Sequence, residues 1–310
     1  MKKFIHYRQK SKNPFPIDPM KPLKYAILVN PASGKTSIDT KRIQLKNAAT
    51  ILQAKIHGLD TNSPEDFKNC ALALASRCDV LVAAGGDGTF SSLINALDTT
   101  ITQVAYLPLG SGNALQYALN YRGSLADIAQ RIQKGRVREY DLINCNQNKR
   151  AFMVSLGIEG TILKLRDRFL QQGLTGFYPY LKAVFFSVLK AYTPAQAVIR
   201  MDDQIKKIPN LLSLMIMKQP YYGYGMKVAP KARFNDHQLH VSSINFDYSK
   251  MILAGLTSFT IGNCAGQYLS CKKVSVMLKK PLYAQIDGDV AWEAEKFNFE
   301  VLPGVLRIKC

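Results

Sequence analysis

Uninterrupted apolar runs, each followed by a loop rich in glycine or small polar residues, recur through the first half of the chain. They cover residues 25–29, 79–84 and 103–108. Runs of this kind are typical of strands buried on both faces of a parallel sheet. Segments with helical residue spacing separate them, at residues 41–55, 63–77 and 90–97. This alternation predicts a layered α/β domain whose ligands bind at the carboxyl ends of the strands.

The second half has short runs rich in β-branched and aromatic residues, separated by Gly, Pro, Asn and Asp. The predicted strands cover residues 151–157, 197–201, 211–217, 239–244, 273–278 and 282–286. Two helices, near residues 162–172 and 178–192, interrupt them, and the apolar positions of the tail alternate on either side of a predicted turn at Pro303-Gly304. This pattern predicts a mostly β, sandwich-like second domain.

Together the patterns predict an α/β protein with three parts. Residues 1–23 form a basic flexible arm, residues 24–141 a three-layer Rossmann-like α/β domain, and residues 142–310 a β-rich domain. The last strands are candidates to return to the first domain.

The charge of the chain narrows the choice of partners. Its 41 Lys and Arg against 22 Asp and Glu give a net charge of +19 over 310 residues, which predicts a polyanionic partner. Nucleic acid, nucleotide phosphates and an anionic membrane all qualify. The six cysteines include no CxxC pair, which indicates reduced cytoplasmic thiols and argues against zinc. Residues 179–192 are too short to span a bilayer, and residues 251–270 are polar enough to suggest a partly buried helix.

The three loops at the predicted strand ends have the composition of a phosphate-binding site. Gly85-Gly86-Asp87-Gly88-Thr89 offers backbone amides that a phosphate can approach, a following helix and a carboxylate. An ordinary strand-to-helix turn also favours Gly and Asp, but three aligned loops favour the phosphate site. The loops match neither common nucleotide motif, because Val29 stands at the first glycine of a P-loop and Leu115 at the last glycine of a dinucleotide fingerprint.

These loops resemble a known family. The segments 30–34 (NPASG), 85–89 (GGDGT) and 108–113 (PLGSGN) look like the three signatures of the diacylglycerol kinase catalytic-domain family, which includes bacterial lipid kinases and the sphingosine and ceramide kinases. The second signature is shared with NAD kinases, and the resemblance extends over residues 24–310. It implies a fold like that of NAD and diacylglycerol kinases, with ATP and Mg²⁺ as cofactors. Residues 24–141 would then be the nucleotide-binding catalytic domain and residues 142–310 the domain that binds the lipid substrate. The implied nucleotide-binding residues are Asn30, Ser33, Gly34, Thr61, Gly85, Gly86, Asp87, Gly88, Thr89, Gly110, Ser111, Gly112 and Asn113, with Asp87 also linked to catalysis through the magnesium of ATP.

The resemblance also implies a structural magnesium in the second half. Residues 229–236 are similar to a family segment in which an Asp and nearby backbone carbonyls bind this ion. By position, the ligands would be Asp236 and the carbonyls of Arg233 and Gln238. His237 stands where the family usually has Gly.

A second acidic motif supplies candidates for the catalytic base. The segment 286–289 (IDGD) looks like the family's Asp-Gly-Glu motif, in which an acid activates the lipid hydroxyl, with Asp289 in place of Glu. Either Asp287 or Asp289 is the implied base, and a plain hairpin turn is the structural alternative. Glu159 lies where sphingosine kinases carry an acid that faces the amino alcohol, so it is a candidate substrate contact.

The resulting hypothesis is an ATP-dependent lipid kinase that phosphorylates the primary hydroxyl of a diacylglycerol-like or sphingoid lipid. It would be a cytoplasmic protein, associated peripherally with an anionic membrane surface, a candidate homodimer, and without a nucleic-acid partner. Two alternatives stay open at this point. One is an NAD kinase-like enzyme, and the other is a catalytically weak module that binds lipid or nucleotide.

Overall fold

The computed structural model describes residues 22–34, 36–146 and 149–310, so nearly all of the predicted basic arm lies outside the described residues. The first part of the chain is an α/β layer, as the apolar runs predict. Its parallel strands lie in the order β4-β3-β1-β2, with β1 at Tyr25–Val29, β2 at Lys55–His57, β3 at Val80–Gly85 and β4 at Gln103–Pro108. Strand β2 was not predicted, because three residues give too short a pattern.

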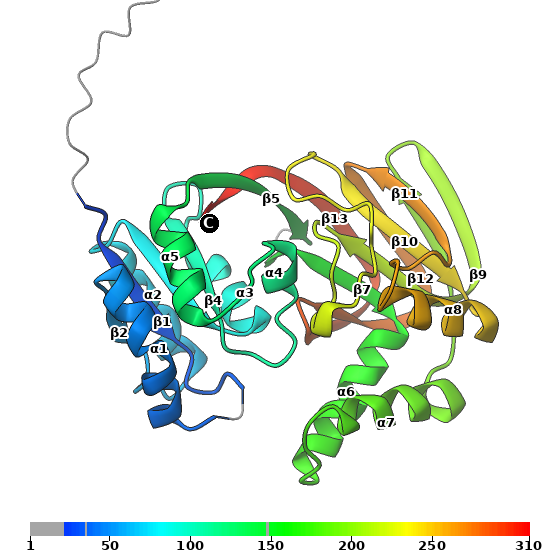
Figure 1. Ribbon diagram of the computed structural model, residues 1–310. Coiled ribbons are helices and arrows are strands. Elements are labelled where there is room, and N and C mark those ends of the chain that lie inside the picture. Colours follow the sequence, from blue (N-terminus) through cyan, green and yellow to red (C-terminus); the bar gives the residue numbers. More distant parts are fainter. Residues whose placement is uncertain (1–21, 35, 147–148) are drawn as a thin grey trace, which may run out of the picture.

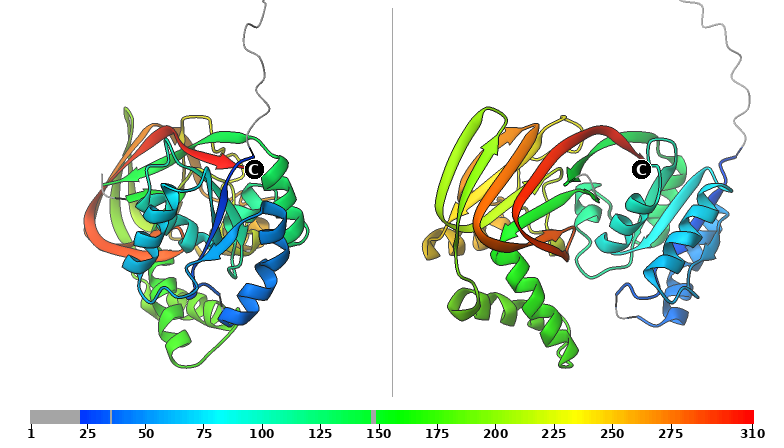
Figure 2. Two further views of the ribbon diagram at one scale, coloured as in Figure 1. Left: turned by 90° about the vertical axis from the view of Figure 1, so that its left-hand side faces the viewer. Right: turned by 180° about the vertical axis from the view of Figure 1, so that it is seen from behind.

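Helices cover both faces of this parallel sheet (Figures 1 and 2). They are α1 (Ile38–Leu52), α2 (Pro64–Ala75), α3 (Asp87–Ala96), α4 (Ala114–Ala118) and α5 (Leu125–Lys134). The strand order reverses direction after β2, and right-handed crossovers therefore place α1 on one face and α2 and α3 on the other. Helix α1 packs on α5, and α2 packs on α3. The reversal lies between β1 and β3, which is where open α/β sheets bind ligands.

The second part is dominated by long antiparallel strands. They are β5 (Val137–Cys145), β6 (Lys149–Ala151), β7 (Met153–Gly157), β8 (Ala195–Met201), β9 (Gln204–Met217), β10 (Leu239–Asn245), β11 (Gln267–Cys271), β12 (Lys273–Ile286) and β13 (Asp289–Lys309). The helical segments are α6 (Ile158–Gln171), α7 (Tyr178–Phe186), the π-helix η1 (Ser187–Ala191), the 3-10 helix η2 (Gly223–Gly225) and α8 (Tyr248–Ser258). The helix predicted within 251–270 is wrong in its second half, which contains β11.

Strand β13 joins the two parts. It pairs with β12 and β5 antiparallel and with β4 parallel, through Arg307 opposite Gln103 and Ile308 opposite Val104. The turn predicted at Pro303-Gly304 is wrong, because the strand continues there with a shift of register between Leu302 and Leu306. All of the strands therefore belong to one hydrogen-bonded network (Figure 1). The predicted division at residue 141 stays a prediction and falls inside β5.

Aromatic packing strengthens the joint between the parts. Phe152 and Phe234 from the β-rich part belong to the core of the α/β part, and the ring of Phe152 lies 5.8 Å from that of Phe90 and 5.7 Å from that of Phe234. Burial of aromatic rings on this scale makes the joint a packed core. Along the described residues, no helix combines the length and the hydropathy needed to cross a bilayer.

Candidate functional site

A cavity of about 480 Å³ lies where the carboxyl ends of β1, β3 and β4 meet the β12–β13 hairpin and helix α6. One wall consists of the three glycine-rich loops, and the opposite wall is largely apolar. The lining residues include Ala32, Ser33, Gly34, Gly86, Asp87, Gly88, Gly110, Ser111, Gly112, Phe152, Leu163, Arg166, Leu170, Tyr180, Tyr222, Met226, Asp287 and Asp289. Parallel strands bring the loops together because their carboxyl ends share one edge of the sheet.

The first loop is fastened to the second by side chains that the sequence singled out. The backbone amide of Gly86 donates to Ser33 Oγ at 2.9 Å. Asn30 Nδ2 donates to Thr89 Oγ1 at 3.3 Å, while Asn30 Oδ1 accepts from the amide of Ala32 at 2.9 Å. Asn30 and Ser33 therefore shape the loops around the cavity.

The second and third loops approach each other at backbone distance. A Cβ atom built on Gly110 would lie 2.4 Å from the Cα of Gly86, so a side chain at residue 110 would push the loops apart. Asn113 closes the third loop, since its Oδ1 accepts from the Gly110 amide and from Tyr106 Oη, both at 3.0 Å. Its φ of 44° lies in the left-handed region that Asn tolerates.

Asp87 ties the second loop to the start of α4. Its two carboxylate oxygens accept from the amides of Ala114 at 2.8 Å and Leu115 at 3.0 Å. Burial raises the pKa of Asp87, and the hydrogen bonds from these amides oppose that shift. The carboxylate lines the cavity and at the same time fixes the position of the third loop.

Asp287 is a buried tether within the hairpin turn. Its Oδ2 accepts from Ser91 Oγ at 2.7 Å, and its Oδ1 accepts from the amides of Phe152 and Met153, each at 3.0 Å. Burial raises its pKa to about 7, although these hydrogen bonds favour the charged form. The Asp287 carboxylate therefore connects the turn to α3 and β7. The structure does contain the hairpin turn that was the structural alternative, with Asp287 and Gly288 as its two turn residues. The same two residues also line the cavity.

Asp289 offers the freer carboxylate. It is exposed at the cavity, and within the described part of the chain its side chain makes no hydrogen bond or ion pair. A Cβ atom built on Gly88 would lie 3.0 Å from Asp289 Oδ2, which places this oxygen directly beside the second loop. The protein atoms around the cavity partly desolvate the Asp289 carboxylate, which raises its pKa, while Lys149 and Arg166 oppose this shift.

Six predicted contacts do not line the cavity: Asn30, Gly85, Thr89 and Asn113 belong to the loops themselves, and Thr61 and Glu159 lie elsewhere. Thr61 lies beyond β2, where its hydroxyl donates to the carbonyl of Gly58 at 2.7 Å. Glu159 is buried in the first turn of α6 and accepts a hydrogen bond from Ser213 on β9. Burial raises the pKa of Glu159 to about 7. It faces the β-rich core, because its hydrogen bond comes from β9 and its helix neighbours Ile158 and Ile162 belong to that core.

Several residues at the site were missed by the sequence reasoning. Ser91 stands four residues after Asp87, one turn along α3, so helical spacing points toward it. Leu163, Arg166 and Leu170 line the cavity from one face of α6, again at helical spacing. No local pattern marks Lys218, whose partners are distant in sequence.

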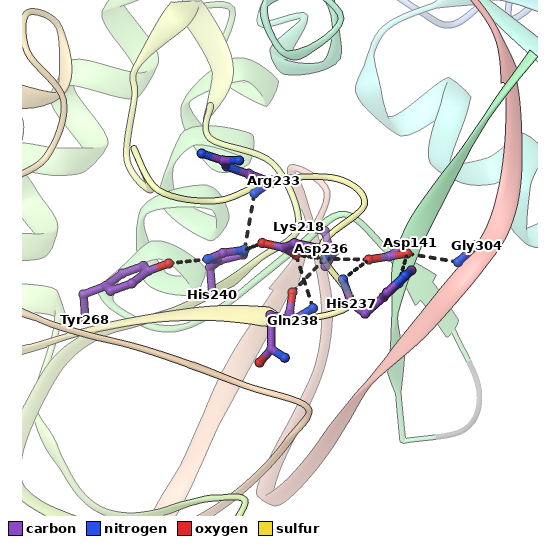
Figure 3. Close-up of polar contacts among 9 residues, drawn as sticks. All are labelled: Asp141, Lys218, Arg233, Asp236, His237, Gln238, His240, Tyr268 and Gly304. Atoms are coloured by element: carbon purple, nitrogen blue, oxygen red, sulfur yellow. Dashed lines mark hydrogen bonds and ion pairs between the residues drawn. The ribbon is translucent and has the colours of Figure 1, made fainter. Parts of the chain in front are cut away.

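The residues predicted to bind a structural magnesium hold a lysine instead (Figure 3). Lys218 Nζ lies 2.8 Å from Asp236 Oδ1, 2.7 Å from the carbonyl oxygen of Gln238 and 2.9 Å from Asp141 Oδ2. The third predicted ligand, Arg233, contributes its amide to His240 Nε2 at 3.3 Å. Among the described residues, no group of three or more His, Cys, Asp or Glu side chains is arranged to hold a metal. This cluster therefore does not fit the predicted magnesium.

Two family models match consecutive parts of the chain. The diacylglycerol kinase catalytic domain matches residues 24–145, and the YegS C-terminal NAD kinase beta sandwich-like domain matches residues 153–310. The two matches together take in every residue that lines the cavity except Phe152.

Curated relatives are distant in sequence. A diacylglycerol kinase of Staphylococcus epidermidis is 25% identical over 219 residues, covering 68% of this chain and 66% of that protein. A putative lipid kinase of Staphylococcus aureus is 22% identical over 265 residues, covering 81% of this chain and 84% of that protein. An uncharacterized protein of Synechocystis is 30% identical over 103 residues, and this chain spans 24% of its length.

The fold also occurs in solved structures. A putative diacylglycerol kinase from Bacillus anthracis matches with a TM-score of 0.74 at 19% identity, covering 94% of this chain and 98% of that one. An NAD kinase from Archaeoglobus fulgidus in complex with ATP matches with a TM-score of 0.50 at 14% identity, covering 92% and 93%. At these identities the likeness shows the fold, which is the α/β domain followed by the β-rich domain that the sequence predicts.

Proposed function

Because the chain belongs to the diacylglycerol kinase family of lipid kinases, we propose that it transfers the γ-phosphoryl group of ATP to the primary hydroxyl of a diacylglycerol-like or sphingoid lipid. One observation carries the proposal. A single cavity has phosphate-type glycine loops on one wall, apolar residues on the other, and the carboxylate of Asp289 between them.

The glycine loops are suited to the phosphates of ATP. Gly86 is the N-cap of α3 and no side chain caps this end of the helix, which leaves its first amides available to an anion. Ser33, Gly34 and Ser111 line the same wall. Bound Mg²⁺ would neutralise charge on the phosphates, and Asp87, whose oxygens keep free lone pairs beside their two amides, is the residue proposed to hold it.

Asp289 is the base that we propose for the reaction. Its carboxylate accepts the proton of the lipid hydroxyl as the oxygen forms a bond to the γ-phosphorus and the bond to the ADP oxygen breaks. Asp287 is the poorer candidate, because three donors already occupy its carboxylate.

The apolar wall and two exposed helices suit a substrate delivered from a membrane. Helix α7 carries Tyr178, Leu181 and Phe185, which are 58%, 57% and 62% exposed, and Tyr180 of the same helix lines the cavity. The α6–α7 pair projects from the body of the molecule (Figure 1). Exposed apolar side chains in such number mark an interaction surface, and the net charge of +19 favours an anionic bilayer.

A phosphotransfer assay tests the proposal. Radiolabelled ATP with Mg²⁺ is offered with diacylglycerol, monoacylglycerol, ceramide or sphingosine in mixed micelles, and with NAD as the competing acceptor. We expect one lipid to be labelled, and Asp289→Asn to lower turnover by about 10²–10⁴-fold while ATP binding is retained. Asp203→Asn, at an exposed turn, is the control and should leave turnover unchanged.

Other outcomes separate the alternatives. Labelled NAD with unlabelled lipids would indicate an NAD kinase-like enzyme. ATP binding without any labelled acceptor would indicate a binding module. Full activity of Asp289→Asn would remove this residue from the mechanism but leave the kinase assignment in place.

A further inference from the structure

Lys218 is a fully buried cation at the centre of a polar cluster. Its side chain is 0% exposed and follows directly after β9, where its backbone amide donates to the carbonyl of Phe152 at 2.8 Å. Its Nζ contacts one oxygen each of Asp141, Asp236 and Gln238 (Figure 3). An ammonium group has three donors and no acceptor, so these three oxygens satisfy it completely.

The distances match an ammonium ion and not a divalent metal. The three oxygens lie 2.7, 2.8 and 2.9 Å from Nζ. Charge-assisted N–H···O bonds are about 2.7–2.9 Å long, whereas Mg²⁺–O distances are about 2.0–2.1 Å and Ca²⁺–O distances about 2.3–2.6 Å. The donor set itself, two carboxylates and a carbonyl, is one that hard cations prefer.

The rest of the cluster holds these oxygens in place. Asp141 Oδ1 accepts from the amide of Gly304 at 2.9 Å, and Asp141 Oδ2 accepts from the amide of His237 at 2.8 Å. The ring nitrogen Nδ1 of His237 lies 3.1 Å from Asp141 Oδ1. Asp236 pairs with His240 Nε2 at 2.7 Å. His237 has a φ of 57°, the conformation that suits glycine, and it uses that strained position to add its amide and ring to Asp141.

The cluster sits where the two parts of the chain join. Asp141 lies on β5, Asp236 and Gln238 precede β10, and Gly304 lies in the register shift of β13. Without a cation between them, the carboxylates of Asp141 and Asp236 would be left facing one another in a buried setting, which is strongly unfavourable.

We propose that Lys218 is a built-in cation that replaces the structural magnesium at this joint, so that the folded protein needs no divalent metal there. The same geometry gives the proposal a second consequence. Shortening Lys218 would leave two carboxylates and a carbonyl around an empty space, which is a site for a divalent cation.

Thermal unfolding in the absence of nucleotide tests both statements. We expect the Tm of the wild-type protein to be the same in chelator, in Mg²⁺ and in Ca²⁺. Lys218→Ala should have a lower Tm in chelator, and Ca²⁺ should raise that Tm by at least several degrees, because its longer bonds suit the spacing better than those of Mg²⁺. Lys207→Ala removes an exposed lysine of β9, the strand that precedes Lys218, and should show neither effect.

A second variant and a second measurement complete the design. Adding Asp236→Asn to Lys218→Ala should abolish the response to Ca²⁺. Metal analysis of the chelator-free wild-type protein after gel filtration should find no stoichiometric divalent ion. This measurement uses only the wild-type protein, so it tests the proposal even if Lys218→Ala does not fold. A wild-type Tm that falls in chelator, a bound stoichiometric metal, or a folded Lys218→Ala that ignores Ca²⁺ would each overturn the proposal.

Discussion

The three aspartates around the cavity have different structural roles because the groups within hydrogen-bond distance of each carboxylate differ. Asp87 accepts two amides of α4 and sets the third loop, Asp287 accepts three donors and anchors the hairpin, and Asp289 is left without a hydrogen bond inside the described chain. The sequence motif named both Asp287 and Asp289 and could not choose between them. The choice depends on Ser91, which lies 196 residues from Asp287 and is brought to it only by the fold.

Glu159 is the residue at which pH should act on stability. Burial raises its pKa from 4.5 to about 7, so the folded protein holds this proton more tightly than the unfolded chain does. The contribution of Glu159 to the free energy of unfolding is therefore fully present below about pH 4. It declines as the pH rises through about 7, by about 3 kcal/mol in all.

Glu159→Gln should remove this dependence. The difference in Tm between the variant and the wild-type protein is expected to rise in favour of the variant from pH 5 to pH 8. Asp287 titrates in the same range in both proteins, so its effect cancels in the difference. Glu293→Gln changes an exposed carboxylate of β13 and is the control. A Tm difference that stays constant with pH would show that Glu159 is charged throughout.

The elements that sequence patterns found best are those whose apolar residues are consecutive. Strands β1 and β4 begin and end where the sequence predicts them, and Ser63 caps α2 as its position before Pro64 suggests. Strand β5 was missed because polar residues stand near its start, whereas helix α5 was missed although its apolar residues have helical spacing and Ser124 and Asp127 form a capping box. The sequence predicted that the three glycine-rich loops lie together, since each follows a strand of the same sheet. It did not predict the hydrogen bonds and close backbone contacts between the loops.

The contact between Gly86 and Gly110 gives a sharp prediction for one of those loops. Gly110→Ala would place a Cβ atom 2.4 Å from the Cα of Gly86, so the two loops must separate. We expect ATP affinity, measured by calorimetric titration, to fall by at least about tenfold, the equivalent of about 1.4 kcal/mol.

Gly255→Ala is the matched control for that experiment. A Cβ atom on Gly255 meets nothing within 4 Å, and the residue lies inside α8, where Ala is the better helix former by about 0.5–1 kcal/mol. This variant should bind ATP normally and be slightly more stable. Normal ATP binding by Gly110→Ala would mean that the nucleotide does not rest on these loops.

At the scale of the whole molecule, the cavity lies between the glycine-rich loops and a projecting pair of helices. The exposed side chains of α7 and the cavity-lining Tyr180 belong to one short helix, so the proposed lipid-collecting surface and the proposed lipid wall are continuous. The sequence made the last strands candidates to return to the first domain, but no local pattern of residues identifies β4 as the partner of β13.

Vesicle sedimentation checks the membrane surface. Leu181→Ser combined with Phe185→Ser should weaken binding to vesicles containing phosphatidylglycerol by at least about tenfold, because two side chains lose their transfer into the bilayer. Ile43→Ser removes an even more exposed apolar residue, from α1, and should have no effect. Unchanged vesicle binding by the α7 double variant would assign membrane contact to another surface.

Strand β13 has a consequence for how the protein is made. Its Leu306 and Ile308 belong to the core of the α/β domain, and its Phe297 and Phe299 belong to the core of the β-rich domain. Domains on a ribosome generally fold in order of synthesis, beginning with the first. Here the first domain lacks an inner strand of its sheet until residues 306–308 have emerged, so it must wait, incomplete, while nearly all of the second domain is translated.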